Sequence, residues 1–109
     1  MNMKFTYSDD WHREGCIFQK QLQLRSPIYY RHVYRKTGEL AGVIVDYETA
    51  DDCHFELTAE DWERFCDRYL HGTDEEQALR EFMTDHDGWY AFEYALRSAG
   101  IEFKKIVYY

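Results

Sequence analysis

The chain has 109 residues, of which 45% are hydrophobic and 31% charged, and its formal net charge is −8 at pH 7. This length and composition predict a single globular domain over residues 1–109, and the aromatic content of 18% argues against intrinsic disorder. No apolar run reaches the roughly 18 residues of a membrane span, and the N-terminus lacks the apolar core of a signal peptide, so we expect neither.

The first half of the chain predicts strands. Residues 16–24 alternate apolar side chains with glutamines, which is typical of a strand with one buried face. Residues 28–36 and 40–48 are rich in Tyr, Val and Ile, and the short turn around Gly38 between them predicts a β-hairpin. Residues 54–57 add a further short strand.

The second half predicts helices. Thr58 and Asp61 form a variant capping box, and apolar residues at helical spacing follow them. Thr73 begins a second capping box and a second apolar stripe. A third helical segment covers 89–99, and the apolar residues of 101–109 predict a last strand that returns to the sheet.

The predicted order of elements is therefore β-β-β-(β)-α-α-α-β. Strands that precede a run of helices indicate an α+β protein with an antiparallel sheet, because parallel sheets need alternating strands and helices. The sequence thus predicts an antiparallel sheet of four to five strands, packed on two to three helices. No repeat or linker divides the chain, which favours one compact domain.

No set of residues has the spacing of a metal centre. His12, Cys16, Cys53 and His54 contain the ligand types of a zinc site, but adjacent Cys53 and His54 would point to opposite faces of a strand. The three cysteines are an odd number for a disulfide framework, which favours a reduced, cytoplasmic protein.

A calcium loop is excluded as well. If Asp85, Asp87 and Gly88 are aligned with the loop positions that they fit, Met83 and Tyr94 fall on the first and last ligand positions, where neither can bind calcium. The alternative is that Asp85 or Asp87 caps the following helix. We expect no bound cofactor or metal.

No catalytic constellation is visible either. Cys66 lies on an apolar helical stripe, where a cysteine is usually inert, and acids near Cys53 disfavour its thiolate. The chain has no glycine-rich phosphate loop and no signature of a serine hydrolase or a zinc protease. The sequence therefore favours a protein that is not an enzyme.

Direct binding of nucleic acid is also disfavoured. Arg31, Arg35 and Lys36 alternate with tyrosines in the predicted hairpin and could contact phosphates and bases. The net negative charge of the molecule nevertheless repels polyanions, and a few basic residues on a hairpin are commonly just a solvated surface.

The negative charge is concentrated in the middle of the chain. Residues 1–45 have a net charge of +3 and residues 88–109 a net charge of +1, whereas residues 46–87 contain fifteen acids and only three arginines, a net charge of −12. Acids near helix N-termini explain part of this excess. A surface tuned for stability alone would mix both signs of charge to form ion pairs, so the excess favours a surface for a basic partner.

We predict that this surface is a ridge formed where the segment around residues 48–54 packs beside the helix that starts after Thr58. A tyrosine next to the acids would anchor the contact, as aromatic residues do at the centres of interfaces. The predicted partner-binding residues are Asp46, Tyr47, Glu48, Asp51, Asp52, Glu56, Glu60, Asp61 and Glu63.

The functional prediction is a small acidic inhibitor or binding module that blocks a basic, nucleic-acid-binding surface of a partner protein. Phage proteins that act against host defences, including anti-CRISPR-like proteins, belong to this class. The alternatives are an immunity protein that neutralises a toxin, or a structural protein that self-associates as a homodimer through exposed Tyr and Trp. A small enzyme is a further alternative that the sequence supports less.

Overall fold

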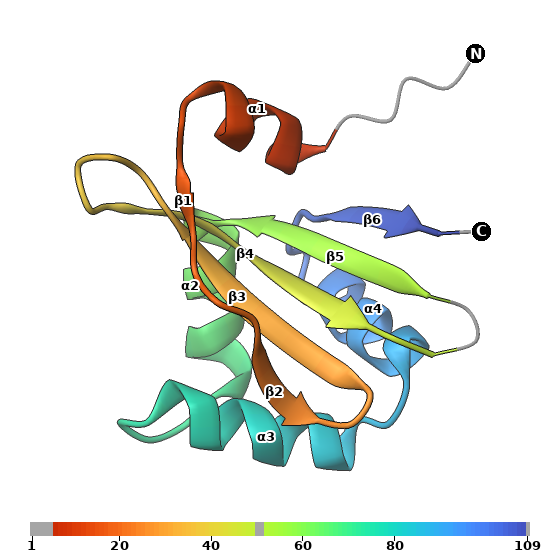
Figure 1. Cartoon of the computed structure of the whole chain (residues 1–109). Helices are drawn as coiled ribbons and strands as arrows, with labels where there is room; N and C mark the ends of the chain where they lie inside the picture. Colours follow the sequence, from red (N-terminus) through yellow and green to blue (C-terminus); the bar gives the residue numbers. More distant parts are fainter. Residues whose placement is uncertain (1–5, 50–51, 109) are drawn as a thin grey trace.

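An antiparallel sheet lies at the centre of the molecule and places the protein in the predicted α+β class (Figure 1). The computed structural model describes residues 6–49 and 52–108. Within these residues the sheet has six strands in the order β1-β3-β4-β5-β6, and β2 also pairs with β3. The strands are β1 (Ile17–Phe18), β2 (Leu22–Arg25), β3 (Ile28–Tyr34), β4 (Leu40–Tyr47), β5 (Cys53–Thr58) and β6 (Lys104–Val107).

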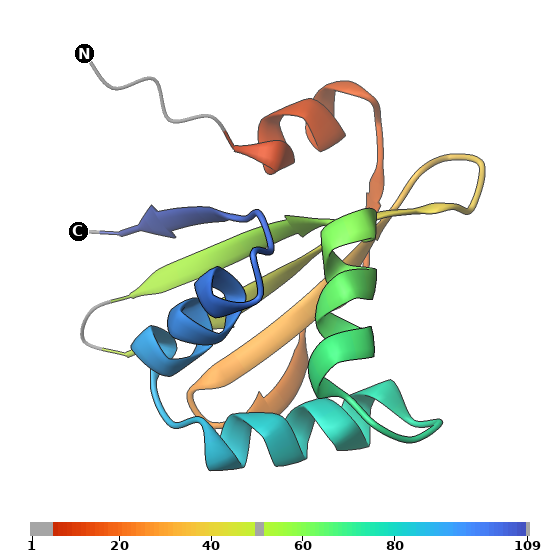
Figure 2. The same cartoon turned by 180° about the vertical axis from the view of Figure 1, so that it is seen from behind.

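Helices cover the two faces of the sheet unequally (Figures 1 and 2). Three helices, α2 (Ala59–Tyr69), α3 (Glu75–Asp85) and α4 (Trp89–Ser98), pack on one face, which we call the helix face. The opposite face, the open face, carries one helix of the described residues, α1 (Tyr7–Arg13), at one end. The sequence did not predict α1. None of the described helices is long and apolar enough to cross a membrane.

The predicted hairpin is the longest pairing in the sheet. Strands β3 and β4 pair from Ile28 opposite Tyr47 to Tyr34 opposite Leu40, and Gly38 in the turn has a φ of 93°. The single strand predicted over 16–24 is instead two strands, β1 and β2, which pair with successive parts of β3. Residues 19–21 between β1 and β2 are not in strand, although the N–H of Gln19 still donates to the carbonyl of His32 on β3, so the period-2 pattern overestimated the length of one regular strand.

The main core lies between the sheet and the helix face. Alternate residues of β4, namely Val43, Val45 and Tyr47, point toward the helices together with Phe55 and Leu57 of β5. Tyr47 is only 1% exposed, and its hydroxyl donates to Sδ of Met83 at 3.3 Å. The predicted role of Tyr47 as a surface anchor is therefore wrong, because the alternation of β4 places its ring in the core.

Of the three helices that the sequence predicted, only α2 begins with the predicted capping residue. Thr58 accepts a hydrogen bond from the backbone N–H of Asp61 and caps α2 as expected. The cap of α3 is Asp74 and not Thr73, since its carboxylate accepts from the N–H of Gln77. The residue before α4 is Gly88, with a φ of 89° and no side-chain cap, so neither aspartate of the preceding segment has the expected capping role.

A smaller core joins α1 to the open face. Trp11 is 4% exposed and lies over Val33, Ala41 and Ile44. Gly42 provides the space for this contact: a Cβ atom there would lie 2.3 Å from Cζ2 of Trp11 and 2.4 Å from the carbonyl oxygen of Leu57. Real Cβ atoms do not approach other atoms so closely, and the second neighbour is backbone that cannot turn aside.

We predict that Gly42→Ala lowers the free energy of unfolding by about 2 kcal/mol, because the added methyl group overpacks the contact between α1 and β4. Urea unfolding of the wild type and the variant measures this difference. Thr49→Ala, at an exposed position, is the control and should change stability by less than about 0.5 kcal/mol. An equally small change in Gly42→Ala would mean that α1 does not pack on the sheet at this point.

Candidate functional site

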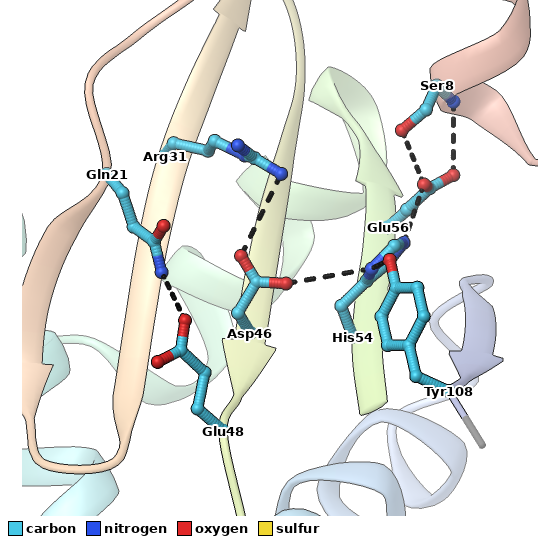
Figure 3. Close-up of polar contacts among 8 residues, drawn as sticks. All are labelled: Ser8, Gln21, Arg31, Asp46, Glu48, His54, Glu56 and Tyr108. Carbon is cyan, nitrogen blue, oxygen red and sulfur yellow. Dashed lines mark hydrogen bonds and ion pairs between the residues drawn. The ribbon is translucent and has the colours of Figure 1, made fainter. Parts of the chain in front are cut away.

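The part of the open face that α1 leaves uncovered carries a polar network (Figure 3). Asp46 on β4 lies directly opposite His54 on β5, and Glu56 follows His54 two residues later on the same face. Arg31 of β3 reaches the same region from the other side of β4. Side chains alternate between the two faces of a strand, so these four residues share a face while their neighbours fill the main core.

Glu56 is the most deeply buried member of this network. It has no exposed surface, and its carboxylate accepts hydrogen bonds from the backbone N–H and the hydroxyl of Ser8 on α1 and from Nε2 of His54 at 2.9 Å. Burial opposes its ionisation, but the hydrogen bonds from His54 and Ser8 outweigh burial and lower the pKa of Glu56. The carboxylate is therefore charged and fixes both α1 and the imidazole ring.

His54 connects the buried carboxylate to the surface. Glu56 can only accept, so Nε2 of His54 carries the hydrogen of this bond, and Nδ1 of the neutral ring accepts from the hydroxyl of Tyr108. Burial, together with the charges of Asp46 and Glu56, raises the pKa of Tyr108. The phenol accordingly remains protonated and acts as a donor.

Asp46 has weaker partners. One of its oxygens lies 3.6 Å from Nδ1 of His54 and the other lies 3.9 Å from Nη2 of Arg31, and neither distance is that of a good hydrogen bond. Burial raises the pKa of Asp46, and the charges of Arg31 and His54 offset this effect only in part. Asp46 is thus a partly desolvated carboxylate with room for a closer cationic partner.

A cleft of about 570 Å³ opens beside Asp46 at the end of the sheet where β4 connects to β5. Gln21 and Tyr108 contribute to its walls, and Gln21 donates to Glu48 at 3.3 Å. The charged residues of its described lining are Arg31, Asp46, Glu48 and Asp52. With three carboxylates and one guanidinium, this cleft has a formal charge of −2, which favours a positively charged ligand.

A larger hollow, of about 710 Å³, lies between α1 and the segment that leads into β6. Its basic residues already have partners. Arg97 and Lys105 both bind Glu93 at 2.9 Å, and Lys104 lies over the ring of Tyr7. The smaller cleft has the stronger unpaired charge, and it is the better candidate site.

Those predicted partner-binding residues that the structure describes do not form one ridge. The connection from β4 to β5 and the start of α2 lie at opposite ends of β5, which at about 3.3 Å per residue is roughly 18 Å long. Asp46, Glu48 and Asp52 meet at the cleft, whereas exposed Glu60 and Glu63 lie on α2.

The other predicted residues are placed differently. Tyr47 borders the cleft but is only 1% exposed, and Glu56 has no exposed surface, so neither side chain offers the predicted contact surface. Asp61 is 7% exposed and accepts from the hydroxyl of Thr58 at 2.9 Å, so it belongs to the start of α2. Asp51 lies outside the described residues.

Sequence reasoning missed His54, Ser8 and Tyr108 as members of a site. The alternation of the predicted strand 54–57 places His54 and Glu56 on one face, and this signal could have paired them. No local signal identifies Ser8 or Tyr108, because 48 and 54 residues, respectively, separate them from their partners.

The chain Tyr108–His54–Glu56 has the order of donor, base and orienting acid that nucleophilic triads use. Burial, together with the charges of Asp46 and Glu56, raises the pKa of Tyr108 and so disfavours its phenolate. The two hydrogen bonds hold His54 and Tyr108 in fixed positions. Among residues 6–49 and 52–108, no three His, Cys, Asp or Glu side chains are grouped as a metal site.

Comparison with protein-family models, with curated proteins and with solved structures found no significant match to this chain.

Proposed function

We propose that the protein is a non-enzymatic binding module that holds a positively charged group of a partner protein in the cleft beside Asp46. The observation that carries the proposal is the convergence of Asp46, Glu48 and Asp52 on this cleft, where Arg31 is the single basic residue of the described lining. These three acids belong to the segment whose charge excess led to the same prediction from sequence.

The cleft fits a lysine or arginine side chain of the partner. Its volume lies within the roughly 300–1,000 Å³ of ordinary ligand sites, and its walls offer carboxylates, an amide and a phenol as hydrogen-bonding groups. Asp46 is partly withdrawn from water, so its attraction for a cation is stronger than that of a fully solvated acid. Glu48 and Asp52 are exposed and can adjust to the incoming group.

Further acids on α2 and α3, at the N-cap of α3 and in the turn after α3 would assist the approach of a basic partner. Within the described chain these acids take part in no ion pair, so their charge is not cancelled locally. A surface potential of one sign raises association rates and is screened by salt. The exposed residues concerned are Glu60, Glu63, Asp67, Asp74, Glu81, Asp85 and Asp87.

The proposal includes a blocking role. A partner that binds nucleic acid does so through basic residues that neutralise phosphates, and an acidic protein seated on those residues would exclude the nucleic acid. A phage protein directed against host defence is the role that we favour, and an immunity protein against a toxin is the alternative. Three free thiols, those of Cys16, Cys53 and Cys66, fit a reducing compartment such as the cytoplasm.

Two charge-matched variants test the proposal. Glu48→Gln with Asp52→Asn removes two charges from the cleft, and Glu60→Gln with Glu63→Gln removes two from α2. We expect the first variant to bind the partner about tenfold more weakly, because each lost exposed ion pair contributes up to about 1 kcal/mol. The second should mainly slow association. The measurement is capture from a host lysate at low and high salt, with mass spectrometry, followed by titration of the purified partner.

Each result has a distinct meaning. A basic protein that is captured at low salt and lost from the cleft variant supports the proposal. Equal capture by the wild type and both variants would contradict the role of the cleft. If no basic protein is captured in a salt-dependent manner, the proposed function is wrong. Sedimentation at two concentrations then checks the alternative of a homodimer formed through the exposed Tyr90 and Tyr94.

A further inference from the structure

His54 contacts two residues of the cleft lining, Asp46 and Tyr108, and both lie near its Nδ1 atom (Figure 3). The hydroxyl of Tyr108 donates to this nitrogen, and a carboxylate oxygen of Asp46 lies 3.6 Å from it. The other ring nitrogen is committed to Glu56 at 2.9 Å. The side chain of His54 is only 8% exposed, so bulk water does not screen these contacts strongly.

Protonation of His54 would change the partners of Nδ1. In the neutral ring this nitrogen accepts from Tyr108 and cannot donate to Asp46. In the protonated ring both nitrogens are donors, so Nδ1–H would face Asp46 and the phenol oxygen, and Tyr108 could no longer donate to it. The new positive charge would lie between the carboxylates of Asp46 and Glu56.

The charge of the cleft depends on this proton. The titratable or charged groups that face His54 or its partners in the described chain are Arg31 from β3, Asp46 from β4, Glu48 after β4, Glu56 from β5 and Tyr108 after β6; α1 contributes the phenol of Tyr7, which lies within electrostatic range of Glu56, and the uncharged Ser8. The lining of the cleft has a formal charge of −2, and a proton on His54 adds a positive charge beside Asp46, one of the lining carboxylates. A cation in the cleft and a proton on His54 would therefore repel each other.

We propose that the cleft binds its cationic group in competition with a proton on His54, so that the protein holds a basic partner at neutral pH and releases it in mildly acidic solution. This inference rests on the proposed function and adds its regulation. Histidine is the side chain that ordinarily changes charge between about pH 5 and 8, which is the range that such a release requires.

Asp46 itself would act in the same direction. Burial raises its pKa, so its carboxylate also becomes neutral at a higher pH than an ordinary aspartate does, and this too would weaken cation binding in acid. The experiment must separate the two groups. His54→Gln does so, because the glutamine amide can still donate to Glu56 but does not titrate. His71→Gln is the matched control, since His71 is exposed and lies outside the network.

The probe is a short arginine-rich peptide, titrated at pH 7.5 and pH 5.5 at constant ionic strength into the wild type, His54→Gln and His71→Gln. We expect the wild type and His71→Gln to bind it about tenfold more weakly at pH 5.5, and His54→Gln to change by less than about threefold. In the wild type, NMR should show that the peptide lowers the pH at which the ring of His54 takes up its proton. This second readout remains informative even if His54→Gln does not fold.

The experiment distinguishes failure of the proton competition from failure of the proposed function. Tight binding at both pH values in the wild type, with no effect of the peptide on the titration of His54, would overturn the competition and leave the cleft as a cation site. An equal loss of affinity in the wild type and His54→Gln would assign the effect to Asp46 and overturn the role of His54. No binding at either pH would overturn both proposals.

Discussion

Replacing Phe92 with alanine will lower the free energy of unfolding by about 4 kcal/mol, because large-to-small changes at fully buried aromatic positions typically cost 3–5 kcal/mol. Phe92 of α4 has no exposed surface. Its ring lies 5.1 Å from that of Phe55, 5.4 Å from that of Phe65 and 6.2 Å from that of Tyr47, measured between centroids. The substitution thus removes the contact that joins α4 to α2 and to two strands of the sheet.

Urea unfolding measures this effect, and thermal unfolding should show a melting temperature lower by about 20 °C. Tyr94→Ala is the matched control on the same helix, because Tyr94 is 74% exposed and alanine favours helix. That variant should differ from the wild type by less than about 0.5 kcal/mol. A loss below about 1 kcal/mol in Phe92→Ala would mean that α4 is not part of the cooperative core.

The elements that local sequence determines were predicted well. The hairpin of β3 and β4 has β-branched and aromatic residues in both strands and a glycine in the turn that adopts a positive φ, and neither feature depends on distant residues. The start of α2 at Thr58 is equally local, because the cap bonds lie within three residues. Where two cap residues are adjacent, as at Thr73 and Asp74, the sequence does not decide between them, and the backbone selects Asp74.

Helix α1 could not be predicted because tertiary contacts determine it. It has seven residues, fewer than an isolated helix needs, and five of them are polar or charged. Its stabilising contacts are with distant residues, through Trp11 over Gly42 and through Ser8 to Glu56. Without α1 the sequence gives no reason to bury the open face of β5, and Glu56 was accordingly predicted to be a surface acid.

Only the part of the candidate site that is local in sequence was predicted. The acid-rich segment identified Asp46, Glu48 and Asp52, which are neighbours in sequence and meet at one cleft. Ser8 and Tyr108, which hydrogen-bond to Glu56 and His54, come from the two ends of the chain, and only the fold brings them to the site. Charge density predicted the negative charge of the cleft, whereas the position of the cleft required the pairing of β4 with β5.

Replacing the buried Glu56 with alanine should lower the free energy of unfolding about as much as Phe92→Ala does. Glu56→Ala leaves the N–H and hydroxyl of Ser8 and the Nε2–H of His54 without their acceptor. A buried donor left without its acceptor typically costs about 1–3 kcal/mol, and hydrogen bonds to a charged group lie toward the upper end, so we expect a loss of about 4 kcal/mol in urea unfolding. Glu60→Ala, an exposed acid on α2, is the control and should change stability by less than about 0.5 kcal/mol.

The pH dependence provides an independent check on this contribution. The hydrogen bonds lower the pKa of Glu56 in the folded state despite its burial, so the unfolded chain binds its proton more readily. The contribution is fully present above the unfolded pKa of about 4.3 and is lost as the pH falls through the lower folded value. Stability measured against pH should therefore decline less steeply below about pH 4.3 in Glu56→Gln than in the wild type. Parallel curves for the two proteins would indicate that the carboxylate is not charged in the fold. In that case Glu56 would not act as the anion that holds His54 beside Asp46 and Tyr108 of the cleft lining.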